Sequence, residues 1–331
     1  MGWQTKFRFS VICMAGIWMT SNKAGAVEGF PAALAQLHPE LTPTCQTCHQ
    51  LGQGETPSHQ NVKVEGRAYY QELMAHEAAQ NKALPVFSDF LAATDFVVFG
   101  DTRTQDDIHR QIVKMICSDN PSFALHTGDM VADGGNSAQW KTALEIESCL
   151  IQNKKLIHAC GNHEGGGCTR NVIRDALDNH DAYFAVEKAG FTFLILNAND
   201  ISADQIAWLK SKPVGPRYVP VYHQAPYPSI AGHGSDKGIV QNFIPEFKRL
   251  GVKVAFNGHN HGYDRSIVDG IQYVTVGGGG APLYPCGGKQ PYTQFCTSDY
   301  GYLRCSINDN RIECGAKRLD ASIIDQFSVS Y

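Results

Sequence analysis

Short apolar runs that stop abruptly at a polar residue beside glycine recur along this chain, and they constrain its fold more than any other feature. The runs are Phe96–Phe99, Phe123–Leu125, Leu156–Ile157, Phe191–Leu196, Tyr218–Tyr222, Val252–Phe256 and Ile271–Val276. Continuous apolar runs of this length are typical of strands whose two faces are both buried. The sequence therefore predicts a central layer of buried strands.

Helical spacing of apolar residues occurs between these runs. Ile108, Ile112 and Ile116 follow Thr104, a candidate N-cap, and a second helical segment extends from Trp140 to Ile151. Alternation of strands and helices predicts an α/β architecture.

The polar residues that follow the apolar runs form one set. Its members are Asp101, Asp129, Asn162-His163-Glu164, His223 and His259-Asn260-His261, and a glycine precedes most of them. Ligands of open α/β sheets bind beyond the carboxyl ends of the strands, so these side chains are expected to converge at one edge. Glycine lets the backbone turn sharply and approach the site closely.

The residue types in this set suit metal ions. Carboxylate and amide oxygens are hard ligands, and neutral imidazoles favour zinc, iron or manganese. The one-residue gap between His259 and His261 puts both rings on the same side of an extended segment. Two adjacent metal ions can then take one ring each. His126 and His158, inside predicted strands, are interpreted as core histidines.

The order of these motifs resembles the calcineurin-like metallophosphoesterase superfamily. The chain contains FGDTR, HTGDMVADG, GNHE, YHQAPY and NGHNHGYDR in sequence between Asp95 and about Cys314. The segments Gln205–Leu209 and GGGGAPLY are most similar to the purple-acid-phosphatase-like branch. The resemblance implies a four-layer αββα sandwich, with a small N-terminal extension in this chain.

The resemblance also implies roles for single residues. Asp101, Asp129 and His261 would hold a first metal ion, and Asn162, His223 and His259 would complete a second, with Asp129 bridging the two. A bridging hydroxide would attack phosphorus without a phosphoenzyme intermediate. His163, oriented by Glu164, would stabilise the phosphoryl oxygens or protonate the leaving oxygen.

Two positions depart from the family pattern. Many members carry a histidine two residues after the first Asp, where this chain has Arg103, and a guanidinium cannot ligate a metal. The purple acid phosphatases have a tyrosine three residues after the second Asp, where Ala132 stands here. Arg103 has two interpretations of equal weight: a cation that faces the substrate phosphate, or a salt-bridge partner of a nearby carboxylate.

The N-terminal part of the chain has the pattern of a secretory signal followed by a small additional segment. Lys6 and Arg8 precede an apolar run that is shorter than the roughly 20 residues needed to span a bilayer, so residues 1–26 are predicted to be a secretory signal peptide. We expect residues 27–92 to form a small segment, 93–318 the catalytic domain and 319–331 a C-terminal tail. The protein is then expected in the periplasm or outside the cell.

The small segment contains Cys45, Cys48 and His49 in a CxxCH pattern, which is the attachment motif of c-type haem. Met74, His59 and His76 are candidates for the second axial ligand. A short disulfide, or a loose metal site with another histidine, remains an alternative.

Eight further cysteines are interpreted as disulfide partners, because export permits disulfides. They are Cys117, Cys149, Cys160, Cys168, Cys286, Cys296, Cys305 and Cys314. Local pairs such as Cys160 with Cys168, Cys286 with Cys296 and Cys305 with Cys314 are one arrangement, but the sequence leaves the connectivity open.

The composition limits which kinds of partner the chain is expected to bind. With 43% hydrophobic and 18% charged residues and a net charge of -4, the chain is typical of a globular protein and has no global attraction to nucleic acid.

The predicted function is hydrolysis of a small phosphorylated substrate by two metal ions (iron, zinc or manganese), without a membrane span after signal removal. Alternatives are a phosphodiesterase or nucleotide hydrolase, and a haem-bearing redox or sensing protein with a non-catalytic phosphoesterase-like domain. Oligomeric state is left open.

Overall fold

The computed structural model describes residues 94–165 and 182–331. They belong to one compact unit, Ala92–Tyr331. The predicted signal peptide, the CxxCH motif and Cys168 lie outside the described residues. None of the helices in the described ranges is both long enough and apolar enough to cross a membrane.

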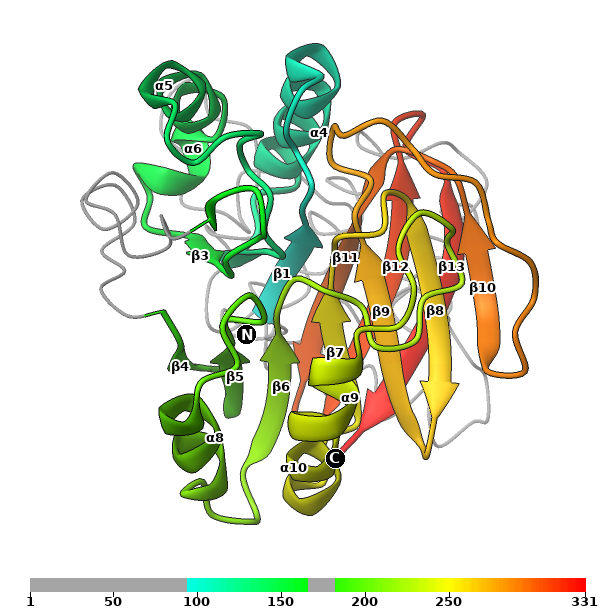
Figure 1. Ribbon diagram of the computed structural model, residues 1–331. Helices are drawn as coiled ribbons and strands as arrows, with labels where there is room; N and C mark the ends of the chain where they lie inside the picture. Colours follow the sequence, from blue (N-terminus) through cyan, green and yellow to red (C-terminus); the bar gives the residue numbers. More distant parts are fainter. Residues whose placement is uncertain (1–93, 166–181) are drawn as a thin grey trace, which may run out of the picture. The chain divides into compact units, whose positions relative to one another are not determined.

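Two sheets form the centre of this unit (Figure 1). The first has the order β13-β12-β11-β1-β2-β3, with β1, β2 and β3 parallel. Its strands are β1 (Thr94–Phe99), β2 (Phe123–His126), β3 (Leu156–His158), β11 (Gly301–Asn308), β12 (Arg311–Arg318) and β13 (Ile323–Ser330).

The second sheet has the order β10-β8-β9-β7-β6-β5-β4, and β5, β6, β7 and β9 run parallel. Its strands are β4 (Phe184–Lys188), β5 (Phe191–Ile195), β6 (Arg217–Val221), β7 (Val254–Asn257), β8 (Tyr263–Val268), β9 (Ile271–Val276) and β10 (Thr293–Thr297).

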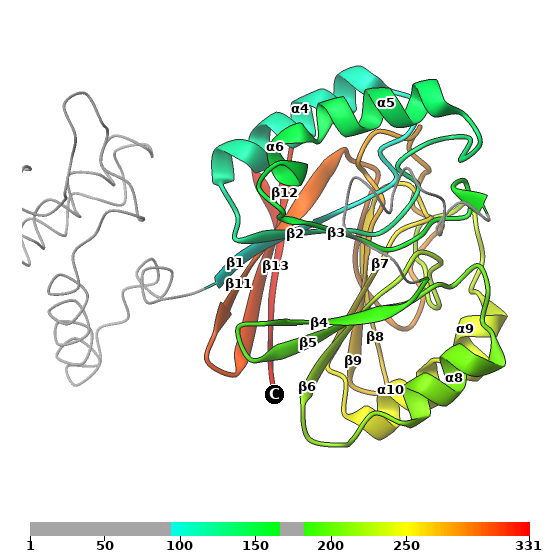
Figure 2. The ribbon, with the colours of Figure 1, turned by 90° about the vertical axis from the view of Figure 1, so that its left-hand side faces the viewer.

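Helices cover the outer face of each sheet (Figure 2). Over the first sheet lie α4 (Asp106–Asp119), α5 (Ser137–Ile146) and α6 (Ser148–Ile151). Over the second lie α8 (Ala203–Lys210), α9 (Lys237–Asn242) and α10 (Ile244–Leu250). The predicted four-layer αββα arrangement is confirmed.

Strand β1 shows why the parallel strands are apolar throughout. Phe96 and Val98 face the second sheet, where the Phe96 ring lies 5.6 Å from that of Phe193. Val97 and Phe99 point the other way, into the layer beneath the helices. Both faces of such a strand are buried, so its residues do not alternate with polar ones.

Two predictions at the ends of elements were wrong. Residues 323–330 of the expected C-terminal tail form β13, which pairs with β12 along its length and buries Val329. Thr104 does not cap α4; its hydroxyl donates to the Arg103 carbonyl, and Gln105 occupies the N-cap position. Thr104 has a positive φ of 75°, which turns the chain before the helix begins.

Disulfides link neighbouring segments, and one of them lies in the core. Cys117 pairs with Cys149 and joins α4 to α6, Cys286 pairs with Cys296, and Cys305 pairs with Cys314 across β11 and β12. The two local pairs among these match the expected arrangement. The third expected pair involves Cys168, which the structure does not describe.

Candidate metal and catalytic site

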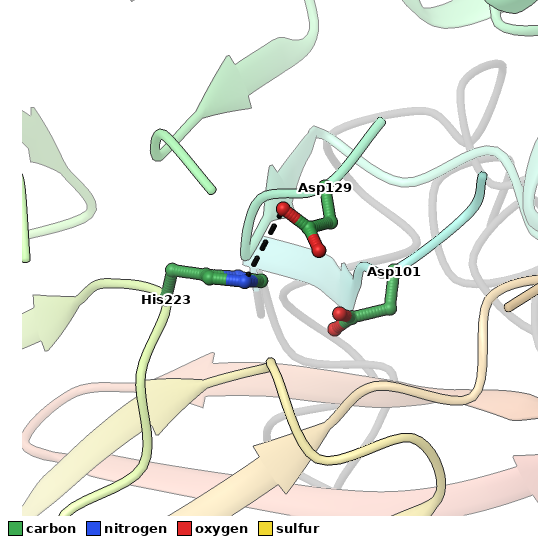
Figure 3. A group of neighbouring side chains, drawn as sticks. All are labelled: Asp101, Asp129 and His223. Atoms are coloured by element: carbon green, nitrogen blue, oxygen red, sulfur yellow. Dashed lines mark ion pairs between the residues drawn. The ribbon is translucent and has the colours of Figure 1, made fainter. Parts of the chain in front are cut away.

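The six predicted metal ligands follow the carboxyl ends of strands from both sheets. Asp101, Asp129 and Asn162 follow β1, β2 and β3, while His223, His259 and His261 follow β6 and β7. Ligand atoms of Asp101, Asp129 and His223 lie within 4.8 Å of one another, and all three residues are buried. Figure 3 shows these side chains pointing toward one another from three separate loops.

Three of these predicted ligand residues hold an unusual backbone conformation. Asp101, Asp129 and His259 have φ values of 54°, 59° and 70°, in the left-handed region that residues other than glycine rarely adopt. The conformation lets the N–H of His259 donate to Asp101 Oδ2 at 2.9 Å. Such strain persists where the surrounding structure holds it, as it commonly does at functional sites.

Glycine is required where the strand-end loops meet. A Cβ on Gly128 would lie 2.7 Å from both the Gly161 nitrogen and His223 Nδ1, and Gly128 also has a φ of 104°. Gly161 is packed against the backbone and side chain of Asp129. These contacts bring the loops after β2 and β3 together, so their polar side chains share one volume.

A cluster of ligand atoms surrounds Nε2 of His223. Nδ1 of this ring donates to the Thr127 carbonyl at 2.9 Å, so in the neutral ring Nε2 carries the lone pair. Nε2 lies 3.0 Å from Asn162 Oδ1, 3.3 Å from Asp129 Oδ1 and 3.2 Å from His259 Nδ1. Nε2 of the neutral ring, Asn162 Oδ1 and Asp129 Oδ1 are all acceptors, so they repel one another unless a cation or a proton lies among them.

The pKa values of the buried groups reflect the same crowding. Burial raises the pKa of Asp101 well above its usual value. Burial has the same effect on Asp129, but the adjacent His223 outweighs it and lowers the pKa of Asp129. Although burial favours neutral His223, the Asp129 and Asp101 carboxylates raise its pKa to about 9. Without a metal, a proton on His223 therefore provides the cation that this cluster needs.

Asp101, Arg103 and His261 form a second group. His261 Nδ1 donates to the Pro282 carbonyl at 2.7 Å, and its Nε2 lies 3.7 Å from Asp101 Oδ1, a buried oxygen without a hydrogen-bond partner. Arg103 Nε donates to Asp129 Oδ2 at 3.2 Å, so the salt-bridge interpretation of Arg103 describes its contacts. Its Nη2 lies 3.2 Å from His261 Nε2.

His163 and Glu164 are positioned differently from the prediction. His163 Nδ1 donates to the Ala132 carbonyl at 2.8 Å, and Nε2 faces Asp129 Oδ2 at 3.9 Å. The buried Glu164 carboxylate accepts hydrogen bonds from the backbone N–H groups of Asp129, Met130 and Gly161. The predicted orientation of His163 by Glu164 was therefore wrong, because Glu164 turns inward to satisfy buried N–H groups while a carbonyl orients the His163 ring.

Two aromatic residues that the sequence assigned no role flank the predicted ligand histidines His259 and His261. The His233 ring stacks on His259 at 3.8 Å between centroids, and the Tyr284 ring stacks on His261 at 4.2 Å. Tyr284 ends the GGGGAPLY stretch, which was the available signal. Stacking limits how each ligand ring can rotate.

The buried His126 supports the same loops from beneath. Its Nδ1 accepts from the Gly128 N–H at 3.1 Å, so Nε2 carries the proton and donates to Thr102 Oγ1, also at 3.1 Å. Burial lowers the pKa of His126, which keeps the ring neutral. This agrees with its interpretation as a hydrogen-bonded core histidine.

Comparison with solved structures finds the same fold in proteins of low sequence identity. A purple acid phosphatase from yellow lupin seeds superposes with a TM-score of 0.63 at 18% identity, over 72% of this chain and 54% of the lupin chain. GAP50, an anchor in the inner membrane complex of Plasmodium, gives 0.61 at 14% identity over 72% and 89%. A dimetal phosphatase from Danio rerio gives 0.52 at 15% identity over 72% and 98%.

At these identities the likeness concerns the fold alone, and the chain spans about half of the lupin enzyme. Comparison with curated protein sequences found no match. The profile of the family described as calcineurin-like phosphoesterase matches residues 94–263, more than half of the 331 residues. These matched residues include all six converging ligand candidates. The chain therefore belongs to the calcineurin-like phosphoesterase family.

Proposed function

We propose that this protein is an exported, metal-dependent phosphoester hydrolase acting on a small phosphorylated substrate. One observation carries the proposal: Asp129 Oδ1, Asn162 Oδ1 and His259 Nδ1 all lie within 3.3 Å of His223 Nε2. Oxygen and imidazole donors in this combination suit zinc, iron or manganese. Membership of the family supports the reaction class.

The donor set fits a metal ion at this cluster, where Asp129, Asn162, His223 and His259 would be its ligands. When bound, a metal ion supplies Lewis acidity and lowers the pKa of a water molecule that can attack phosphorus. The Thr127 carbonyl keeps the His223 ring in the tautomer whose Nε2 faces the cluster.

Other side chains would bind and orient the phosphoryl group. His163, whose side chain is 33% exposed, faces the site with Nε2 and, as the imidazolium, can donate the Nε2 proton to the leaving oxygen. Arg103 has N–H groups beyond those bonded to Asp129 and His261, and these can bind a phosphoryl oxygen.

The test is phosphate release by the exported, full-length protein, with and without a chelator. We expect chelation to abolish release from a generic phosphomonoester and re-addition of Mn²⁺ or Zn²⁺ to restore it. Release that ignores the chelator would contradict the proposal. The same assay with a diester and a nucleotide separates the phosphatase from its alternatives, and a metal-binding protein without activity on any of them would favour a non-catalytic role.

We also propose that the CxxCH segment carries a c-type haem, supported by the motif at Cys45, Cys48 and His49 and by the signal-like N-terminus. We expect the mature exported protein to show haem absorption, and Cys48→Ser to weaken its covalent attachment. A colourless mature protein without haem iron would favour the short disulfide.

A further inference from the structure

The guanidinium of Arg103 bridges two of the groups expected to bind the first metal ion. Nε donates to Asp129 Oδ2 and Nη2 donates to His261 Nε2, each at 3.2 Å. The side chain is only 13% exposed, so the contact is shielded from water.

Because of the tautomer of His261, the Arg103 contact and a metal ion would compete for the same lone pair. Because Nδ1 donates to the Pro282 carbonyl at 2.7 Å, the single lone pair of the neutral ring is on Nε2. A metal ion needs that lone pair at about 2.0–2.1 Å, and the Arg103 N–H already takes it. The same guanidinium also takes Asp129 Oδ2, so a metal ion bound by both atoms would lie against a fixed positive charge.

The predicted ligands of the first metal ion also offer few donor atoms. Position 132, three residues after Asp129, is alanine, and Arg103 offers no lone pair. Asp101, Asp129 and His261 are the three remaining predicted ligands among the residues that the structure describes. The donor atoms around His223 differ, because Asn162 Oδ1, His259 Nδ1 and Asp129 Oδ1 lie 3.0–3.3 Å from His223 Nε2, whereas Arg103 bonds to Asp129 Oδ2 and His261 Nε2. The residues present therefore fit one metal ion and do not fit the other.

We propose that this chain binds one metal ion, at Asp129, Asn162, His223 and His259, and that the Arg103 guanidinium supplies the second positive charge in place of the first metal ion. This rests on the proposed function for its chemical meaning. Asp129 keeps its bridging place, with Oδ1 toward His223 and Oδ2 toward Arg103. Arg103 then remains beside the phosphoryl group as a permanent cation that chelation does not remove.

Metal counting tests this directly. Full-length exported protein is stripped with a chelator, reloaded with Mn²⁺, freed of excess ion and analysed for manganese per chain, so that haem iron is not counted. We expect one Mn²⁺ for the wild type, and two for Arg103→His, which removes the guanidinium and adds an imidazole lone pair. Electron paramagnetic resonance should show an isolated Mn²⁺ in the wild type and a spin-coupled pair in Arg103→His.

Further variants separate the two sets of ligands. His261→Ala should keep one Mn²⁺, whereas Asn162→Ala should weaken binding of that single ion. Arg110→His makes the same change at an exposed position of α4 and should keep one ion. Circular dichroism checks folding, and the wild type, His261→Ala and Asn162→Ala decide the count even if Arg103→His misfolds.

Two spin-coupled Mn²⁺ ions in the wild type, or none, would overturn the proposal. A folded Arg103→His that stays at one ion would overturn the part assigned to Arg103. The count is made without substrate, so a protein that binds one ion but releases no phosphate would contradict the proposed function and leave this inference standing.

Discussion

Single residues at this site act through contacts that their neighbours in the sequence do not reveal. Glu164 follows the predicted ligand Asn162 by two positions, yet its carboxylate satisfies three backbone N–H groups on the loops after β2 and β3. Asp129 is held in the left-handed conformation between this anchor and the Arg103 guanidinium. Glu164 is therefore a positioning residue for the loop that presents Asp129.

Glu164→Gln tests this anchoring. An amide has one oxygen to accept hydrogen bonds, and its NH₂ group would face a backbone N–H, which leaves a buried donor unpaired. We expect the free energy of unfolding to fall by about 1–3 kcal/mol, measured by denaturant titration, with weaker Mn²⁺ binding. Glu145→Gln, at an exposed position of α5, is the matched control and should change stability by no more than about 0.5 kcal/mol. Equal, small effects of both changes would argue against the anchor.

His163→Ala tests the predicted proton donor. Loss of the ring should lower kcat by roughly 10²- to 10⁴-fold while the metal content stays unchanged. If His163 protonates the leaving oxygen, the loss should be larger for an alkyl phosphate than for a nitrophenyl phosphate, whose leaving group needs less assistance. Equal losses would indicate stabilisation of the phosphoryl oxygens instead, and an unchanged kcat for both substrates would exclude either role.

At the scale of elements, the ends of the parallel strands position the candidate site, and an edge strand of the first sheet covers part of the core. The parallel strands β1, β2, β3, β6 and β7 direct their following loops to one site. Strand β13 closes the other edge of the first sheet, and its Asp325 accepts two hydrogen bonds from Arg265 of β8 and one from Tyr263. The C-terminal strand thus ties the two sheets together.

Adjacent positions on β13 provide a matched pair. Val329 is 7% exposed and packs in the core between the sheets, whereas Ser330 is exposed on the opposite face. Val329→Asp should lower the free energy of unfolding by more than about 2 kcal/mol, because it buries an unpaired carboxylate. Ser330→Asp should stay within about 0.5 kcal/mol. If thermal or denaturant unfolding shows both variants alike, β13 does not pack as a strand in solution.

For the whole molecule, the site exists only because two sheets meet. Asp101, Asp129 and Asn162 come from the first sheet, and the three histidines come from the second. Within the second sheet of this assembly, the buried Asp264 of β8 accepts from the N–H groups of Ser229 and Ile230 and from the Thr275 hydroxyl. Its ionisation therefore couples pH to the stability of this assembly.

Burial raises the pKa of Asp264 to about 7 in the folded protein, from 3.8 for an ordinary aspartate. The folded state thus holds this proton more tightly than the unfolded state. Its contribution to stability is complete below pH 3.8 and is lost as the pH rises through about 7. Between pH 5 and pH 8, the free energy of unfolding of the wild type should fall relative to Asp264→Asn by about 2.5 kcal/mol.

Urea titrations of both proteins at the two pH values measure this difference, in which contributions from other titrating groups cancel. A difference that does not change with pH would mean that Asp264 stays ionised throughout.

The sequence predicted the strands that are buried on both faces, and it missed those that are not. β1, β2, β3, β5, β6, β7 and β9 correspond to the apolar runs. In β12 buried residues alternate with more exposed ones, and β4 has no buried residue, so neither forms a continuous apolar run. β13 was assigned to a tail because its pairing partner and the sheet edge it covers are properties of the folded chain.

The sequence by itself determined which side chains could bind a metal ion, because the residue type and the end of a buried strand are both encoded within a few neighbouring positions. Tertiary structure alone decided the partners of the charged groups. Arg103 meets Asp129 and His261, which are 26 and 158 residues away, and Glu164 meets backbone N–H groups up to 35 residues away. Such pairings depend on how the two sheets pack against each other, and no local sequence pattern specifies that packing.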